Sequence, residues 1–402
     1  MDKNRSGSLA YTGFAFITAL IGFNWFMWGS LLDSTLEPHY KVSGFLLALF
    51  ISSIPIMLVL FSYFVGNMAD RDPKKTTIIS SLILLITVLV RPFTLFNFYV
   101  LLSDQLVFAL SAAFCFPSWA SLTYRLFDKE KAASRIAGFT AALTGGQILA
   151  FLITFPLVNR LGLLTVLWVY GIISAIFAVF YIFVIRKTEF PFTPNITERP
   201  SLIEGAKIVL SEKSMIPLMV ISFLDIGVFA WLAGWYPHIL VQYKGITPTE
   251  AGIVNSVILI GCLIGAETVP NIAHHIRKVK VFLLILPLIC IGMLSIVPVI
   301  SNFWLFLIDG LILGFALFPM YPLGVHLPSA YSKIGITFAG VGSGIMLIAG
   351  NLGGFLLPEL GATVSQINRA ILLFGIIPML LMFLSALFFK DPDTYANGKS
   401  KA

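Results

Sequence analysis

Charged residues are scarce in this sequence of 402 residues. Asp, Glu, Lys and Arg make up 11% of it, whereas hydrophobic residues make up 58%. Soluble globular domains contain about 25% charged and roughly 45–50% apolar residues, so a water-soluble globule is excluded. The apolar excess also excludes a disordered chain. A mean hydropathy of +0.94 instead predicts a polytopic membrane protein.

Cysteine is rare as well. The sequence has three, Cys115, Cys262 and Cys290, and each lies in an apolar run. A disulfide framework is therefore not predicted. The sequence lacks the G-x-x-x-x-G-K-[ST] pattern of nucleotide-driven pumps. Its five histidines form no H-x-x-x-H cluster of the kind that a metalloenzyme uses. We therefore expect neither an enzyme nor a bound cofactor or metal.

Long apolar stretches recur along the whole chain. A transmembrane helix needs about 20 such residues to cross a hydrocarbon core of ~30 Å. Twelve stretches are long enough: 11–32, 43–66, 76–96, 98–122, 135–158, 163–186, 215–238, 250–270, 281–301, 303–326, 335–357 and 366–389. The sequence therefore predicts an all-α membrane protein with twelve transmembrane helices. The first stretch is longer than the core of a signal peptide and is predicted to be the first span.

One long polar connection divides these spans into two sets of six. Residues 187–214 are predicted to be a cytoplasmic linker between an N-terminal bundle, residues 1–186, and a C-terminal bundle, residues 215–402. Residues of the two halves match at spacings of 204 to 206: Phe98 with Phe303, Asp104 with Asp309, Pro117 with Pro322, Trp25 with Trp231, and Gln147 with Asn351. The repeat predicts two pseudo-symmetric halves and resembles the architecture of major facilitator transporters.

The distribution of basic residues predicts the orientation. Of the 26 Lys and Arg residues, all lie on the side of the N-terminus except Lys41, Arg91, Arg160, Lys244 and Arg369. Because cytoplasmic loops are enriched in Lys and Arg, both termini are predicted to be cytoplasmic, in a multi-pass protein of the plasma membrane. The net charge of +7 is then explained by the enrichment of Lys and Arg in the cytoplasmic loops. Nucleic acid is therefore not a predicted partner. The chain is expected to be a monomer.

A charged connection between the second and third spans carries a motif. Gly66, Asp70, Arg71, Lys74 and Lys75 resemble the major facilitator signature G-x-x-x-D-R-x-G-R-[RK]. The resemblance implies an element that gates the cytoplasmic side and does not bind substrate. Glycine allows two helices to approach, and Asp70 offers an acceptor to a neighbouring helix. A charged tight turn without a gating role is the alternative.

This motif departs from the family pattern at two places. Pro73 stands where the second glycine is usual, which predicts a stiffer turn. The counterpart in the second half, 271–281, is degenerate and has His275 where an aspartate is expected.

Four acidic residues lie inside the predicted spans: Asp104, Asp225, Glu267 and Asp309. A charge there costs ~2.5–3.5 kcal/mol even on a lenient scale and usually marks a functional cavity. Since no Lys or Arg lies more than about a turn inside any span, we expect each acid to be protonated, solvated or neutralised by a cationic ligand. Asp104, Asp225 and Asp309 are predicted cavity or proton-coupling acids. Hydrogen bonding to helix ends or tyrosines is the alternative, and Glu267 is predicted to lie at the interface.

Aromatic and amide residues supply candidate substrate contacts. Trp25 and Trp231 are predicted to face the cavity, where their rings would attract an organic cation by ~0.5–2 kcal/mol each. Packing or an interfacial belt is the alternative for both. Gln147 and Asn351 are predicted to reach the cavity because a mid-membrane amide needs a partner. Asp225 is predicted to contact the substrate as well.

The stretch Gly22–Trp25, together with Gln147, resembles the feline leukaemia virus subgroup C receptor-type transporters of choline, ethanolamine and haem. The resemblance implies that Asn24 and Trp25 bind substrate and that Asn351 stands where that family has a glutamine. The tyrosine of its aromatic cage is replaced here by Ala230, which puts choline itself in doubt.

These observations predict a secondary active or facilitative transporter of a small organic solute by alternating access. The solute is expected to be cationic or neutral, such as a choline-like amine, because cavity Arg or Lys for an anion is missing. A coupled proton or sodium ion is a possible partner alongside the bilayer. Proton-coupled efflux of lipophilic cations or of other metabolites is the alternative. A membrane enzyme and a non-transporting receptor are less well supported.

Overall fold

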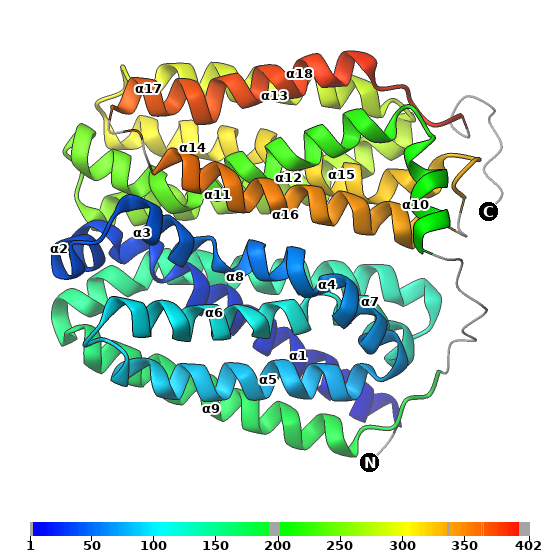
Figure 1. Cartoon of the computed structure of the whole chain (residues 1–402), viewed down its shortest axis with the longest axis horizontal. Coiled ribbons are helices and arrows are strands. Elements are labelled where there is room, and N and C mark those ends of the chain that lie inside the picture. Colours follow the sequence, from blue (N-terminus) through cyan, green and yellow to red (C-terminus); the bar gives the residue numbers. More distant parts are fainter. Residues whose placement is uncertain (1–2, 193–201, 336–337, 363, 365, 394–402) are drawn as a thin grey trace. The chain divides into compact units, whose positions relative to one another are not determined.

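The computed structural model describes residues 3–192, 202–335, 338–362, 364 and 366–393, and every regular element in that part is helical (Figure 1). The chain forms two compact units, residues 1–196 and 197–402, and each is described by itself. Among the described residues, 12 helical segments are long and apolar enough to cross a membrane. The prediction of an all-α membrane protein with twelve spans is therefore confirmed.

The first unit contains α1 (Lys3–Phe26), η1 (Gly29–Leu31), η2 (Leu32–Leu36), α2 (Glu37–Tyr40), α3 (Gly44–Ile51), α4 (Ser53–Arg71), α5 (Pro73–Val90), η3 (Arg91–Phe93), α6 (Phe98–Cys115), α7 (Ser118–Leu126), α8 (Lys129–Leu161) and α9 (Leu163–Lys187). The second unit contains α10 (Leu202–Leu210), α11 (Met215–Lys244), α12 (Pro248–Ile276), α13 (Val279–Ile296), α14 (Phe303–Leu317), α15 (Met320–His326), η4 (Leu327–Ala330), α16 (Ala339–Gly361), α17 (Ile367–Ile371), η5 (Leu372–Ile376) and α18 (Ile377–Phe388).

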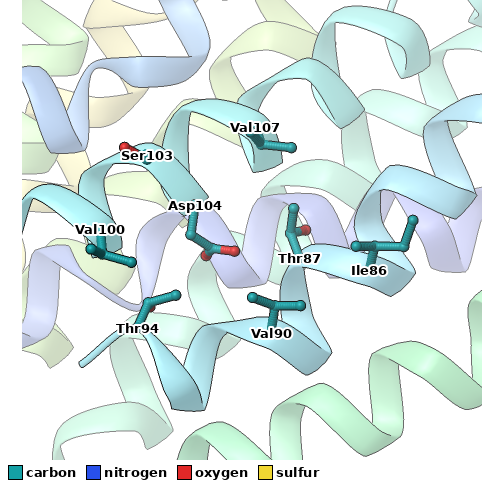
Figure 2. Close-up of a pocket in the computed structure, with 8 residues that line it drawn as sticks. All are labelled: Ile86, Thr87, Val90, Thr94, Val100, Ser103, Asp104 and Val107. Carbon is teal, nitrogen blue, oxygen red and sulfur yellow. The ribbon is translucent and has the colours of Figure 1, made fainter. Parts of the chain in front are cut away.

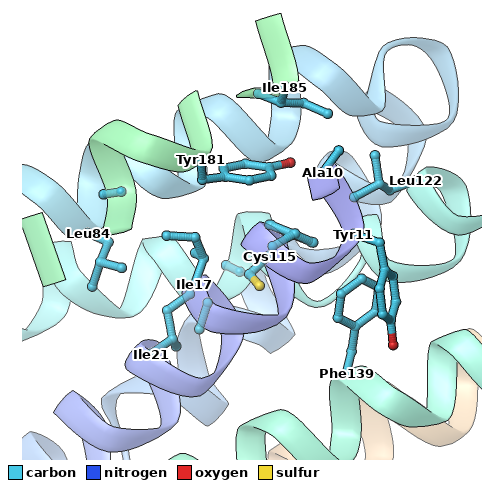
Figure 3. Close-up of a cluster of buried hydrophobic side chains, with 14 of the residues drawn as sticks. Ala10, Tyr11, Ile17, Ile21, Leu84, Cys115, Leu122, Phe139, Tyr181 and Ile185 are labelled. Atoms are coloured by element: carbon cyan, nitrogen blue, oxygen red, sulfur yellow. The ribbon is translucent and has the colours of Figure 1, made fainter. Parts of the chain in front are cut away.

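The core of the first unit is built around α1 (Figure 3). The Phe14 ring packs against Phe139 of α8 and Tyr181 of α9, with centroids 5.4 and 5.2 Å apart. The Tyr181 hydroxyl donates to the Thr77 hydroxyl of α5 at 2.8 Å, so its one polar atom is satisfied. Cys115 of α6 is buried in the same cluster. Aromatic packing and interhelical hydrogen bonds thus hold helices whose outer faces meet lipid.

Glycines allow two helix pairs to approach backbone to backbone. A Cβ atom on Gly146 of α8 would overlap the Ala19 carbonyl oxygen of α1. A Cβ atom on Gly353 of α16 would overlap the Phe223 carbonyl oxygen of α11 in the same way. Inside a membrane the hydrophobic effect does not drive helices together, so they associate through close van der Waals packing. Small residues at a crossing allow that close packing. The two units therefore use the same device on corresponding helix pairs, α1 with α8 and α11 with α16.

The second span, predicted over 43–66, is broken into two helices. Helix α3 ends at Ile51 and α4 begins at Ser53. Pro55 has no N–H and cannot donate to the Ile51 carbonyl four residues earlier. The indole Nε1 of Trp25 donates to that carbonyl instead, at 2.8 Å. The helix then continues to Arg71, which places the Gly66–Asp70 part of the motif on α4.

Proline also breaks the fourth and tenth spans. Pro117 precedes α7, and Pro319 precedes α15. The sequence repeat pairs Pro117 with Pro322, but Pro322 lies within α15. The break in the second unit therefore falls about one turn earlier than the repeat suggests.

Candidate functional site

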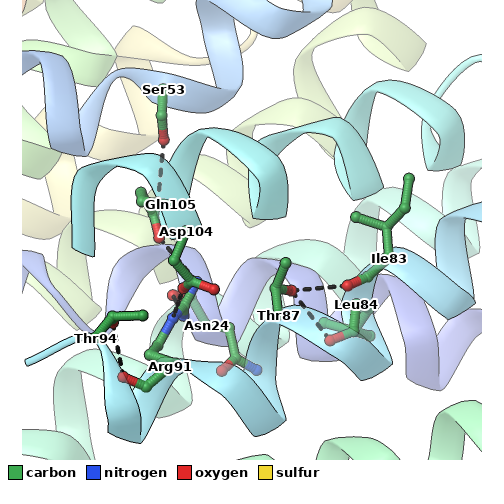
Figure 4. A network of polar contacts seen from close by, with 9 residues as sticks. All are labelled: Asn24, Ser53, Ile83, Leu84, Thr87, Arg91, Thr94, Asp104 and Gln105. Atoms are coloured by element: carbon green, nitrogen blue, oxygen red, sulfur yellow. Dashed lines mark hydrogen bonds and ion pairs between the residues drawn. The ribbon is translucent and has the colours of Figure 1, made fainter. Parts of the chain in front are cut away.

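Asp104 forms a buried ion pair with Arg91 in the first unit. The Arg91 Nε atom lies 2.9 Å from the Asp104 carboxylate, and the two side chains are 1% and 4% exposed. Arg91 follows directly on α5, and Asp104 lies in the second turn of α6. The guanidinium also donates to Gln105 Oε1 at 3.0 Å and to the Asn24 carbonyl at 3.5 Å. Gln105 in turn donates to Ser53 Oγ at 3.2 Å (Figure 4).

Two aromatic rings cover the Arg91 guanidinium. Its carbon lies 4.6 Å from the Phe108 ring centroid and 5.8 Å from that of Trp28. The expectation that the intramembrane acids have no basic partner is therefore wrong for Asp104. Arg91 was assigned to the outer end of its span, within a turn of the boundary, but a side chain of that length reaches back to the first turns of the next helix.

Asp309 holds the equivalent position in the second unit without such a partner. Asn97 and Asn302 cap α6 and α14 identically, each accepting from the backbone N–H two residues on at 2.8 and 2.9 Å. Asp309 is 2% exposed, and neither carboxylate oxygen accepts a hydrogen bond from the described residues. Arg91 is the residue that directly follows α5, whereas Val297 directly follows α13. The counter-charge is thus replaced by an aliphatic side chain.

Each acid lines a cavity that opens at the surface of its own unit. The first cavity has a volume of about 280 Å³, and Asp104 lies there with Thr87, Thr94 and Ser103 (Figure 2). The second, about 170 Å³, is lined by Met293, Ile296, Ile300, Leu305, Ile308, Asp309 and Ile312. Asp104 therefore has polar neighbours, whereas Asp309 is surrounded by apolar ones.

Asp225 lies in the interior of the second unit. It is 0% exposed, and neither carboxylate oxygen has a hydrogen bond of good geometry from the described residues. Its titratable neighbours are Cys262 of α12, Cys290 of α13 and Tyr321 of α15, which places the side chain among these helices. Glu267, in contrast, is exposed near the end of α12.

The predicted substrate residues on α1 contact other helices of the first unit. Asn24 is 2% exposed, and its amide donates to the Leu20 carbonyl at 2.9 Å and to Ser174 Oγ at 3.1 Å. Trp25 is half-buried, with its N–H bound to the Ile51 carbonyl. The two neighbours therefore point toward α9 and α3 respectively. Their polar atoms have structural partners, whereas the aromatic face of Trp25 does not need one.

The remaining predicted contacts do not converge within their units. Trp231 is 1% exposed and packs against Phe374 and Gly361, away from the neighbours of Asp225. Asn351 donates to Leu347 of its own helix at 2.9 Å. Gln147 is 3% exposed and has no hydrogen bond to any described residue.

The charged motif makes contacts among four helices of the first unit. The Ser121 hydroxyl of α7 donates to the Asp70 carboxylate, and Arg125 donates to the Asp70 carbonyl at 2.8 Å. Lys74 donates to the Thr188 carbonyl at 2.7 Å, just beyond α9. A Cβ atom on Gly66 would reach van der Waals distance of Pro117. The end of α4 is thus connected to α7, and the start of α5 to the end of α9. Arg71 and Lys75 are exposed.

The second unit retains part of this arrangement with different residues. Asp72 caps α5 by accepting from Lys75 N at 3.0 Å. Lys278 stands at the equivalent cap of α13, and Asp391 accepts from Lys280 N there at 2.9 Å. Lys280 Nζ donates to the Leu387 carbonyl of α18 at 2.8 Å, as Lys74 does after α9. His275 is exposed.

Comparison with known proteins decides the family. The profile of the Major Facilitator Superfamily matches residues 14–358. The chain belongs to the Major Facilitator Superfamily. An uncharacterized protein of Archaeoglobus fulgidus is 24% identical over 207 residues, which cover 52% of this chain and 92% of that relative.

Solved major facilitator structures share the fold. The crystal structure of the nucleoside transporter NupG is 17% identical, with a TM-score of 0.72 over 95% of this chain and 99% of that one. A bacterial homologue of the human lysosomal transporter Spinster, inward-facing and unoccupied, is 15% identical, with a TM-score of 0.67 over 95% of this chain and 94% of that one. At these identities the likeness shows the fold alone.

Sequence reasoning missed three polar residues of this major facilitator protein. Arg91 was treated as an outer charge, and Gln105 and Tyr236 were not considered. A signal for Arg91 is present, because a basic residue at the end of one span precedes an acid in the second turn of the next. Antiparallel neighbouring helices place such residues at the same depth. Tyr236 carries no comparable signal.

Proposed function

We propose that the chain is a secondary active or facilitative transporter that moves a small, neutral or cationic organic solute by alternating access. Membership of the Major Facilitator Superfamily supports transport of a small molecule across a membrane. We further propose that it acts as a monomer in the plasma membrane with both termini cytoplasmic, as the distribution of Lys and Arg predicts.

The proposed solute class rests on how the charged side chains inside the spans are paired. Among the buried side chains of the described residues, Arg91 is the basic one, and it forms an ion pair with Asp104. Asp225 and Asp309 have no such partner in the described part of the chain. An anionic solute would need a free guanidinium or ammonium group to replace its water. The spans therefore suit a solute without negative charge.

A choline-like amine is the first candidate, and Trp25 supports it. The bond from Trp25 to the Ile51 carbonyl fixes the orientation of the half-buried indole ring. A quaternary ammonium over the face of such a ring gains ~0.5–2 kcal/mol. The resemblance of Gly22–Trp25 to the choline and ethanolamine transporters points to the same class.

A neutral, hydrogen-bonding solute such as a nucleoside is the second candidate. Gln147 favours it, because this buried amide has no hydrogen bond to the described residues. A buried amide is costly unless a partner satisfies it, and a polar solute would be such a partner. The fold likeness to the nucleoside transporter NupG agrees with this candidate without deciding it.

Ligand-induced thermal stabilisation of the purified protein tests these candidates. Choline, uridine, tetraphenylphosphonium and succinate are compared, since a ligand at 100 times its Kd stabilises by ~2.7 kcal/mol. Stabilisation by choline or uridine, followed by uptake of that compound into proteoliposomes, supports the proposal. Stabilisation by succinate alone contradicts it, and a response to tetraphenylphosphonium alone favours efflux of lipophilic cations.

Two variants at one position separate the candidates. Trp25→Phe and Trp25→Ala both lose the bond to Ile51, but only Trp25→Ala loses the aromatic face. We expect Trp25→Phe to keep most of the choline response and Trp25→Ala to lose it. Gln147→Leu should leave the choline response intact and reduce that of uridine.

A further inference from the structure

The two cavities described above occupy equivalent positions in the two units but differ in polarity. Three side chains that line the first cavity beside Asp104 carry hydroxyl groups (Figure 2): Thr87, Thr94 and Ser103. At the repeat spacing of 205 or 206, the side chains in their places lack oxygen: Met293, Ile300 and Ile308. We propose that the first cavity binds the glycerol hydroxyl groups of a neutral, phosphate-free membrane lipid such as a monoacylglycerol. This binding does not depend on which solute the protein transports.

The first cavity presents hydrogen-bond acceptors. Each of the three hydroxyl groups donates its hydrogen to a backbone carbonyl three or four residues earlier, at 2.8 Å, so its oxygen is left to accept. One carboxylate oxygen of Asp104 accepts from Arg91 at 2.9 Å, and the other has no hydrogen-bond partner among the described residues. An acceptor that faces hydrocarbon without a donor is costly. The ligand that fits therefore has to donate hydrogen bonds.

The charge of the cavity favours a neutral ligand. The negative charge of Asp104 is already balanced by Arg91, which is 1% exposed. A lipid phosphate is bound most strongly by Arg and Lys, and the lining residues in this described part of the chain include neither. An ammonium headgroup would add an unbalanced positive charge beside the neutral ion pair. Hydroxyl groups donate hydrogen bonds without bringing a charge, so they match the cavity.

The depth of Asp104 points to the glycerol region of a lipid. Tyrosine is enriched at the headgroup level of membrane proteins, and Tyr99 is 61% exposed near the start of α6. Asp104 follows five residues later, which is about 7.5 Å deeper along the helix axis. The phosphate and amine of a phospholipid lie in the headgroup layer outside this level. The hydroxyl groups of a monoacylglycerol are instead attached to the glycerol that carries the acyl chain.

The size and rim of the cavity suit a headgroup whose chain stays in the bilayer. Its volume of about 280 Å³ is just below the ~300–1,000 Å³ of sites that enclose a whole small molecule. Ile86 and Val107 line the cavity about one turn deeper than Val90 and Asp104, and they are 58% and 47% exposed. Their apolar surfaces lead toward the middle of the bilayer. The acyl chain therefore packs along them while the glycerol occupies the cavity.

Photolabelling of the purified full chain tests this site. The protein is placed in phosphatidylcholine nanodiscs with a monoacylglycerol that carries a diazirine in its acyl chain, and peptide mass spectrometry locates the label. We expect labelling of the α5 and α6 peptides around Ile86 and Val107, and only background labelling of the equivalent α13 and α14 peptides. Unlabelled monoolein should remove the label at about tenfold lower concentration than its dimethyl ether, which has the same chain and no donor.

Matched variants separate the hydroxyl groups from the shape of the cavity. Thr87→Val nearly preserves the volume and removes one acceptor, so the apparent affinity for monoolein should fall about two- to tenfold. The affinity for the dimethyl ether should stay the same. The Thr87 hydroxyl donates within its own helix, so this variant is expected to fold. Ser103→Ala repeats the test at an exposed position, and Met293→Leu in the second cavity should change neither affinity.

Several outcomes would overturn the proposal. Equal competition by monoolein and its dimethyl ether would mean that the cavity takes acyl chains alone. Competition by phosphatidylethanolamine at the concentration of monoolein would mean that an ammonium group is the donor. Equal labelling of the two cavities would show that the hydroxyl groups do not select the ligand. Unchanged affinity for monoolein in both Thr87→Val and Ser103→Ala, in protein that elutes as a single folded species, would show the same.

Discussion

Trp25 donates its indole N–H to the carbonyl oxygen of Ile51 at 2.8 Å, and this bond repairs a defect in a neighbouring helix. Ile51 lies four residues before Pro55, which has no N–H to offer it. A carbonyl left without a donor inside a membrane costs several kcal/mol. Trp25 is therefore a structural residue of the first unit whatever solute its ring contacts.

This relationship predicts a rescue between two positions. Trp25→Phe leaves the Ile51 carbonyl without a donor and should destabilise the protein by about 1–3 kcal/mol. Pro55→Ala provides a backbone N–H, so the double variant Trp25→Phe/Pro55→Ala should recover part of that loss. Thermal unfolding in detergent measures both. Additive losses in the double variant would show that Pro55 is not the reason for the bond.

The buried pair of Arg91 and Asp104 should be costly to break. Arg91→Met leaves the Asp104 carboxylate without its counter-charge and should destabilise the protein by about 3–5 kcal/mol. Asp104→Leu leaves the Arg91 guanidinium without its counter-charge and should have a similar effect. The double variant Arg91→Met/Asp104→Leu should lose much less than the sum, which a double-mutant cycle of unfolding free energies shows. Arg160→Met, at an exposed arginine, serves as the control. A coupling energy near zero would argue against the pair.

Adjacent glycines on α8 should respond oppositely to the same change. Gly146→Ala introduces a Cβ atom that overlaps the Ala19 carbonyl, so α1 and α8 must separate and the melting temperature should fall. A Cβ atom on Gly145 meets nothing within 4 Å, and Gly145→Ala should stabilise by about 0.5–1 kcal/mol through helix propensity. Equal effects of the two variants would contradict the close approach of these helices.

The predicted orientation can be read with single cysteines. Cys115, Cys262 and Cys290 are all buried, so the wild-type protein gives little background with a membrane-impermeant maleimide. Lys41 and Arg277 are exposed in connections predicted to lie on opposite sides of the membrane. In intact cells Lys41→Cys should be labelled and Arg277→Cys should not, while both react after permeabilisation. The reverse pattern would place the termini outside.

The fold could be predicted from the sequence because its determinants are local. Apolar length predicts each span, and the spacing of Asp104 and Asp309 reveals the repeat. Apolar length alone does not locate the break at Ser52, because an apolar run looks the same whether or not a proline interrupts its hydrogen bonds. Pro55 was visible, but the donor that makes the break tolerable, Trp25, is thirty positions away.

The candidate site was harder to predict because it depends on pairs of residues from different helices. Asp225 and Asp309 were found as buried acids, since acids inside spans are rare. The partner of Asp104 was not found, because a sequence gives the depth of Arg91 but not the direction of its side chain. Asn24 and Trp231 were correctly placed inside spans, yet only coordinates show that they contact their own unit.

The carboxylate of Asp391 comes from the segment after the last span, and it caps a helix more than a hundred residues earlier. The final residues of the described chain thus take part in holding α13 in place. Replacing the chain from Asp391 onward with an affinity tag or fluorescent reporter would remove the hydrogen bond from Lys280 N to Asp391. A tag attached after the last residue of the sequence would keep this bond.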